Sequence, residues 1–170
     1  MNSKTGLKIT YFAFLIMFLQ PLLDLLSTSF SLNVPFISTI AENRFFSPAL
    51  WVLAALGYLI SFFAEHDIFD LAIGGGFVIH AISILLPSTI FTLIFLAVLF
   101  IWAIKIMQKG RISRALPLIV VALMQFAIAF VVPRLDLGYI SMLLSYSTFV
   151  LQIYYIGVYL SASIYDATAE

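Results

Sequence analysis

The chain has 170 residues, of which 64% are hydrophobic and only 9% are charged, whereas a soluble domain has about 25% charged residues. With so few polar side chains the protein cannot cover its surface in water, so the composition excludes a soluble globular domain and indicates an integral membrane protein. The formal net charge is zero and the sequence has no cysteine, which excludes the basic surface of a nucleic-acid-binding protein, disulfide bonds and cysteine-ligated metal sites.

The predicted fold is all-α: a polytopic bundle of six transmembrane helices that form one transmembrane domain over residues 1–170. A spanning helix needs about 20 mostly apolar residues. The stretches that meet this requirement are, in chain order, about 8–30, 48–64, 68–86, 88–107, 115–132 and 138–162.

Two of these predicted spans have a rival interpretation. The first stretch could be a cleavable signal peptide, but its length, together with Pro21 and Asp24, favours a spanning helix. The third and fourth stretches could form one long apolar run, which is too long for a single crossing. Pro87 can end one helix or start the next, so we expect two helices here.

Basic residues in the short loops predict the orientation of the chain. Six of the eight Lys and Arg residues lie on one side, and only Arg44 and Arg134 lie on the other. This asymmetry predicts a plasma or inner membrane protein with both termini in the cytoplasm. The largest basic group is a turn with an ordinary explanation in topology and contact with anionic lipids; it consists of Lys105, Lys109, Arg111 and Arg114.

Polar residues form a stripe along two predicted helices. In 138–162 they recur at steps of three and four residues, which places them on one helix face: Ser141, Ser145, Thr148, Gln152, Tyr155 and Tyr159. The stripe of the first helix is polar only in its outer half, at Gln20 and Asp24. Because the hydrophobic effect does not drive helices together in lipid, such faces mark surfaces buried between helices.

The predicted helices in the middle of the chain differ in how many polar residues they carry. In 68–86 His80 and Ser83 share a face with Gly76, and the run Gly74 to Gly76 predicts a place where another backbone comes close or the helix bends. In 115–132 Gln125 is the main polar residue. The span 88–107 is almost wholly apolar, which favours the most lipid-exposed position.

Most strongly polar residues within the spans share one depth. A rise of about 1.5 Å per residue places them roughly 15–25 Å from the cytoplasmic helix ends. We predict that they line an intramembrane seam that binds a substrate: Asp24, His80, Gln20, Ser83, Gln125, Ser145, Thr148 and Gln152.

Asp24 and His80 carry the sharpest prediction, because an intramembrane carboxylate usually has a function. We expect the two side chains to face one cavity and to approach each other directly or through a water or ligand. The alternatives are an Asp24 that lies half hydrated at the interface and a neutral His80 that is hydrogen-bonded to a neighbouring helix. His66 and His80 are about 21 Å apart along a helix, so they cannot share a haem iron.

The pattern favours a protein that binds or transports a small polar solute or ion, together with a partner subunit or as a homo-oligomer within the lipid bilayer. The alternative function is a non-catalytic structural or assembly subunit of a larger membrane complex. A third possibility is an intramembrane enzyme, but the sequence has none of the common catalytic motifs. The sequence identifies neither a cofactor nor a metal site.

Overall fold

The computed structural model describes the backbone of residues 3–30, 43–134 and 138–168, and the side chains of residues 3–23, 43–134 and 150–168. The helices are α1 (Ser3–Phe30), α3 (Phe46–Glu65), α4 (Ile68–Leu85), α5 (Thr89–Gln108), α6 (Ile112–Phe126) and α7 (Gly138–Thr168). A π-helical turn (Ala127–Val131) and a 3-10 turn (Val132–Arg134) extend α6. The described chain is therefore an all-α bundle, and each helix coincides with a predicted stretch to within a few residues.

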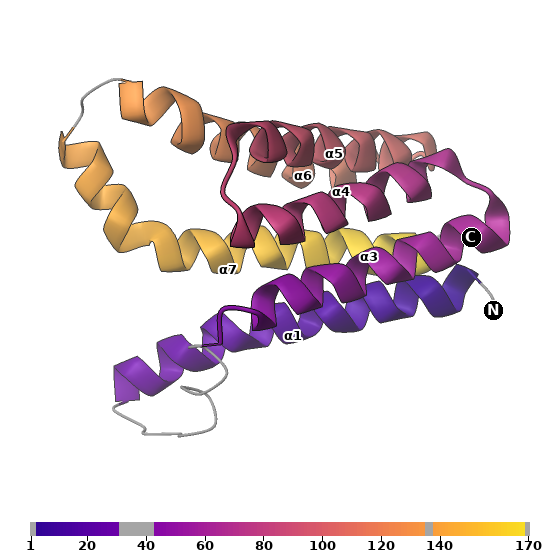
Figure 1. Cartoon of the computed structure of the whole chain (residues 1–170), viewed down its shortest axis with the longest axis horizontal. Helices are drawn as coiled ribbons and strands as arrows, with labels where there is room; N and C mark the ends of the chain where they lie inside the picture. The colour runs from indigo at the N-terminus through magenta and orange to yellow at the C-terminus, as the bar shows by residue number, and fades with distance from the viewer. Residues whose placement is uncertain (1–2, 31–42, 135–137, 169–170) are drawn as a thin grey trace.

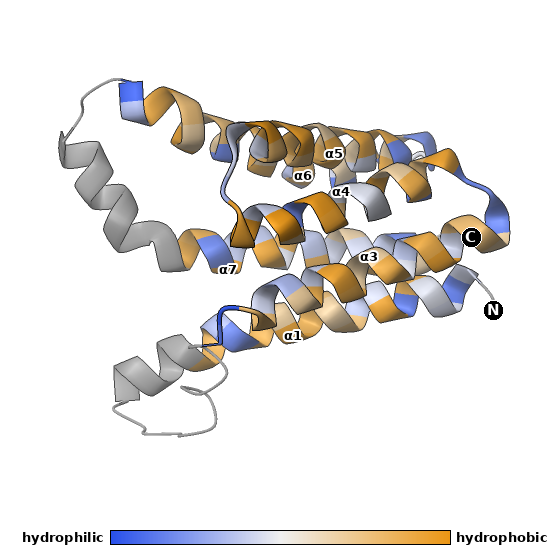
Figure 2. Ribbon diagram, viewed as in Figure 1, coloured by the Kyte–Doolittle hydropathy of each residue, from blue (hydrophilic) through white to orange (hydrophobic). Residues whose placement is uncertain are grey.

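Five helical segments in the described part of the chain are long and apolar enough to cross a membrane. Their bounds are Ser3–Leu23, Phe46–Glu65, Ile68–Leu85, Thr89–Gln108 and Ile112–Arg134. Figure 2 shows hydrophobic residues along the length of these helices and the most hydrophilic residues mainly at turns and helix ends. The protein is an integral membrane protein with several spanning helices.

The helices lie alongside one another in one elongated bundle (Figure 1). Helix α1 packs against α3 and α7, α4 packs against α3 and α5, and α6 packs against α5 and α7. The start of α1 and the end of α7 lie at the same end of the bundle, together with the α3–α4 and α5–α6 turns. We call this the termini end of the bundle and the opposite one the far end.

Local sequence explains the sharp turns between helices. His66 ends α3 with a left-handed backbone (φ 59°), and its amide donates to the Phe62 carbonyl at 2.7 Å. The Asp67 side chain then caps α4 by accepting from the Phe69 amide at 2.9 Å. Pro87 lies between α4 and α5, so the apolar run divides into two helices where the proline predicted it.

Glycines allow two helix pairs to approach closely. A Cβ atom on Gly57 in α3 would lie 2.4 Å from the Gly6 carbonyl oxygen in α1, and one on Gly76 in α4 would lie 2.2 Å from a methyl carbon of Val98 in α5. The expected close contact at the glycine run therefore occurs at Gly76, whereas a Cβ on Gly75 would meet nothing within 4 Å.

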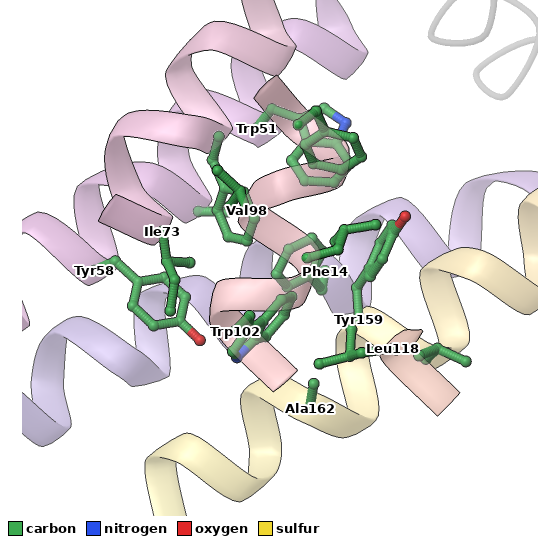
Figure 3. Close-up of a cluster of buried hydrophobic side chains, with 14 of the residues drawn as sticks. Phe14, Trp51, Tyr58, Ile73, Val98, Trp102, Leu118, Tyr159 and Ala162 are labelled. Carbon is green, nitrogen blue, oxygen red and sulfur yellow. The ribbon is translucent and has the colours of Figure 1, made fainter. Parts of the chain in front are cut away.

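An aromatic cluster occupies the middle of the bundle (Figure 3). Phe14 of α1 contacts Trp51 and Trp102, with ring centroids 5.4 and 6.0 Å away, and Tyr159 of α7 at 5.9 Å. Phe77 of α4 closes the cluster at 5.6 Å from Phe14. We call this group of rings the aromatic layer.

Helix α5 corrects one prediction. The span 88–107 is not the most lipid-exposed one, because eight of its residues are buried, among them Phe95, Trp102 and Lys105. The prediction was wrong because lipid chains are as apolar as leucine, so an almost wholly apolar helix fits the protein core as well as it fits the bilayer.

A polar cavity and a buried charge network

A cavity of about 410 Å³ lies among α1, α3, α4, α6 and α7. The amides of Gln20, Gln125 and Gln152 line it, together with the side chains of Trp51 and His80. Among the residues whose side chains the structure describes, none that lines the cavity is an Asp, Glu, Lys or Arg. The described part of the wall is therefore polar and carries no permanent charge. We call this volume the polar cavity.

Helix positions place the polar cavity in the far half of the bundle. Trp51, His80 and Gln125 lie 12 to 14 residues from the helix ends at the termini end, which corresponds to roughly 18–21 Å along the helices. This depth agrees with the range expected for the predicted seam.

Aromatic rings hold His80 in place. Its ring stacks on Phe95 with centroids 3.7 Å apart and meets Trp51 edge-on at 4.5 Å. The Ser83 hydroxyl donates to the His80 carbonyl at 2.7 Å and lies 3.4 Å from His80 Nδ1. Ser83 thus supports the turn of helix that carries His80, rather than forming part of the cavity wall.

Two tyrosines of α7 line the same cavity and differ in whether their hydroxyl has a hydrogen-bond partner. The Gln125 amide nitrogen donates to the Tyr159 hydroxyl at 2.7 Å. The Tyr155 hydroxyl is buried and has no hydrogen-bond partner among the described residues. Buried polar atoms in proteins are nearly always paired, by protein, by water or by a ligand, so an unpaired hydroxyl beside an empty volume indicates a place for another molecule.

The structure brings together half of the predicted seam residues. Those that line the polar cavity are Gln20, His80, Gln125 and Gln152. The side chains of the predicted residues Asp24, Ser145 and Thr148 lie outside the described residues, and so does the expected approach of Asp24 to His80.

A second polar group lies at the termini end, and its centre is Asp70 of α4. This carboxylate accepts from Ser61 of α3 at 2.7 Å and forms an ion pair with Lys105 of α5. Lys105 also lies 3.5 Å from a carboxylate oxygen of Asp67. Because Asp70 is fully buried and Lys105 is 5% exposed, each charge depends on the other for compensation.

Asp166 adds α7 to this group through Tyr58, whose ring centroid lies 5.5 Å from Lys105 Nζ. One oxygen of Asp166 accepts from the Tyr58 hydroxyl at 2.5 Å and from the Trp102 indole at 2.7 Å, and Figure 3 shows these two donors close together. The other oxygen lies 3.2 Å from Lys109 Nζ. The residues joined here form the buried charge network: Tyr58, Ser61, Asp67, Asp70, Trp102, Lys105, Lys109 and Asp166.

The sequence analysis overlooked this network and misplaced one of its members. Lys105 does not belong to an exposed basic turn, because its side chain points into the bundle. Asp166 could have been found, since the polar stripe of α7 continues from Tyr159 by steps of three and four to residue 166. Asp70 lies within the first turn of its helix, where a carboxylate passes for an ordinary interfacial residue.

The two polar groups differ in what they can do chemically. Within the described residues no group of three or more His, Asp or Glu side chains could hold a metal ion, and the buried polar atoms of the network pair with one another. The polar cavity has empty volume and an unpaired hydroxyl, so it is the candidate functional site. We found no family model, curated protein or solved structure that matches this chain.

Proposed function

We propose that this membrane protein binds a small, uncharged polar solute in the polar cavity. The observation that carries this proposal is the buried Tyr155 hydroxyl, which has no partner among the described residues, beside a volume of about 410 Å³. That volume is within the range of about 300–1,000 Å³ that is usual for small-molecule sites. Pockets between the helices of a bundle are a common location for such sites.

The chemistry of the wall supports a neutral ligand over an ion. Buried charges in proteins are paired with an opposite charge or coordinate a metal, and the lining residues that the structure describes include no Asp, Glu, Lys or Arg. Three glutamine amides can each donate and accept hydrogen bonds, while the rings of Trp51 and Tyr159 offer apolar faces. Hydroxyl-rich or amide-bearing solutes with one apolar face match this combination.

The orientation belongs to the proposal as well. With six basic residues at the termini end and two at the far end, the positive-inside rule places both termini in the cytoplasm of a plasma or inner membrane. The polar cavity would then open toward the outer leaflet. We infer that translocation would involve a partner subunit or a homo-oligomer, because the helices of the described bundle are few for two alternating gates.

Trp51 provides a direct test of binding. The chain has two tryptophans, of which Trp51 lines the cavity and Trp102 lies in the buried charge network. We expect neutral sugars, amides or nucleosides from a solute panel to shift tryptophan emission and raise the melting temperature of the purified protein. Charged analogues of the same size should do neither.

Matched variants connect that response to the cavity. Gln125→Ala should weaken binding at least tenfold, because it removes both an amide from the wall and the hydrogen bond to Tyr159. Gln108→Ala should leave binding unchanged, since Gln108 is exposed at the end of α5. A panel without any response, combined with extraction in mild detergent as part of a stoichiometric large complex, would instead identify a structural subunit.

A further inference from the structure

A second hollow of about 750 Å³ lies where α1, α6 and α7 meet. Its wall is apolar along most of its length, with Phe18, Ile153 and Val158 among the lining residues. Ser113 and Arg114 line it at the termini end, in the first turn of α6. We call this hollow the lateral groove.

Arg114 lines the polar end of the lateral groove, and a second cation, Arg111, lies over the same aromatic ring. The guanidinium groups of Arg114 and Arg111 lie 4.3 and 5.3 Å from the centroid of the Tyr165 ring. Neither has a carboxylate within ion-pair distance among the described residues. Guanidinium groups that rest on an aromatic ring keep their N–H donors available, and these donors match the geometry of a phosphate group.

We propose that the lateral groove binds one anionic phospholipid of the leaflet at the termini end. The phosphate contacts Arg111, Arg114 and Ser113, and one acyl chain follows the groove toward the middle of the membrane. Charge complementarity favours this occupant over a helix of another protein, because the cations lie at headgroup depth while the rest of the wall is apolar.

Gly157 gives the groove its depth. It lines the groove at the middle of α7, and a Cβ atom there would lie 3.3 Å from the ring of Phe18. From Ser161 to Ile153 the groove follows α7 for about 12 Å, so an acyl chain lies against protein over much of one leaflet.

The test measures lipid binding to the full-length protein in mild detergent. Native mass spectrometry and thermal unfolding compare dioleoyl phosphatidylglycerol with dioleoyl phosphatidylcholine, and inorganic phosphate serves as the probe for a free anion. We expect phosphatidylglycerol to bind more tightly and to raise the melting temperature more. Arg114→Gln should lower the affinity for phosphatidylglycerol about fivefold, which is the contribution of one basic residue to binding at an anionic surface. It should also remove most of the preference for phosphatidylglycerol over phosphatidylcholine.

Two further variants separate the headgroup site from the groove. Arg44→Gln is the matched control, because Arg44 is also exposed and rests on a ring, that of Phe45, but lies next to the start of α3 at the far end. It should leave both affinities unchanged. Gly157→Leu should weaken the binding of both lipids equally, because the larger side chain fills the groove. If Gly157→Leu does not fold, the comparison of Arg114→Gln with the wild type still tests the proposal.

Three results would overturn the proposal. These are equal affinity of the wild type for the two lipids, an equal loss in Arg44→Gln and Arg114→Gln, and stabilisation by inorganic phosphate as large as that by phosphatidylglycerol. The last result would indicate a site for a soluble anion rather than for a lipid.

Discussion

The buried charge network and the polar cavity lie in the same bundle and differ in almost every physical respect. In the network, Asp70 and Asp166 are buried and each accepts several hydrogen bonds or ion pairs from neighbouring helices. In the cavity, the described part of the wall carries no Asp, Glu, Lys or Arg, and the Tyr155 hydroxyl has no partner among the described residues.

This difference indicates how polar groups inside a membrane protein divide their roles. A group whose partners are all supplied by the protein joins helices, and removing one partner leaves the other uncompensated. A group that lacks a partner costs stability in the empty protein and is favoured only when a ligand supplies the missing contact. We therefore expect stability to depend on the network and binding to depend on the cavity.

The largest effect should follow from breaking the network at its ion pair. Lys105→Met leaves the Asp70 carboxylate buried without its cation, which should lower the free energy of unfolding by about 3–5 kcal/mol. Denaturant unfolding in detergent measures this. Lys109→Met is the matched control, since the Lys109 side chain is 32% exposed and should cost no more than about 1 kcal/mol. Equal losses in the two variants would contradict a special role for Lys105.

A pair of tyrosine variants compares the two regions with the same chemical change. Tyr58→Phe removes a donor to the Asp166 carboxylate and should cost about 1.5–3 kcal/mol of unfolding free energy. Tyr155→Phe removes an unpaired hydroxyl, so it should leave stability unchanged or slightly increased while weakening solute binding. Thermal unfolding and tryptophan emission measure both quantities. A larger stability loss in Tyr155→Phe than in Tyr58→Phe would reverse the assignment of roles.

The smallest effect concerns Gly76 in α4, between Asp70 and His80. Gly76→Ala places a methyl group against Val98 and should cost about 1–2 kcal/mol by separating α4 from α5. It should also weaken solute binding, because His80 stacks on Phe95 of α5. Gly75→Ala should be neutral or stabilising, by up to about 1 kcal/mol, since nothing lies near that position. A Gly75→Ala variant as unstable as Gly76→Ala would show that the contact with Val98 is not the cause of the loss.

Hydropathy predicted the helices well because each apolar stretch has the length of a span and ends at charged residues, glycine or proline. The far-side polar seam was also foreseeable in part, since depth and helix face follow from sequence spacing alone. Four of its residues line the cavity for that reason: Gln20, His80, Gln125 and Gln152.

The charge network could not be predicted in the same way. Whether Lys105 extends to the interface or turns inward depends on which helix lies beside it, and spacing within one helix carries no such information. Asp70 and Lys105 are 35 residues apart in the sequence, and their pairing joins α4 to α5. An almost wholly apolar helix such as α5 likewise gives no indication of which face meets protein and which meets lipid.

The aromatic layer has an electrical consequence. Phe14, Phe77 and Trp102 have no exposed surface, so water does not reach these three rings. Packed rings have a low dielectric constant, so in a bilayer a voltage would fall more steeply across this layer than across hydrated helix ends. For the proposed solute to pass from the cavity toward the termini end, these rings would have to separate, and each such ring contact is worth about 0.5–1.5 kcal/mol beyond its buried area.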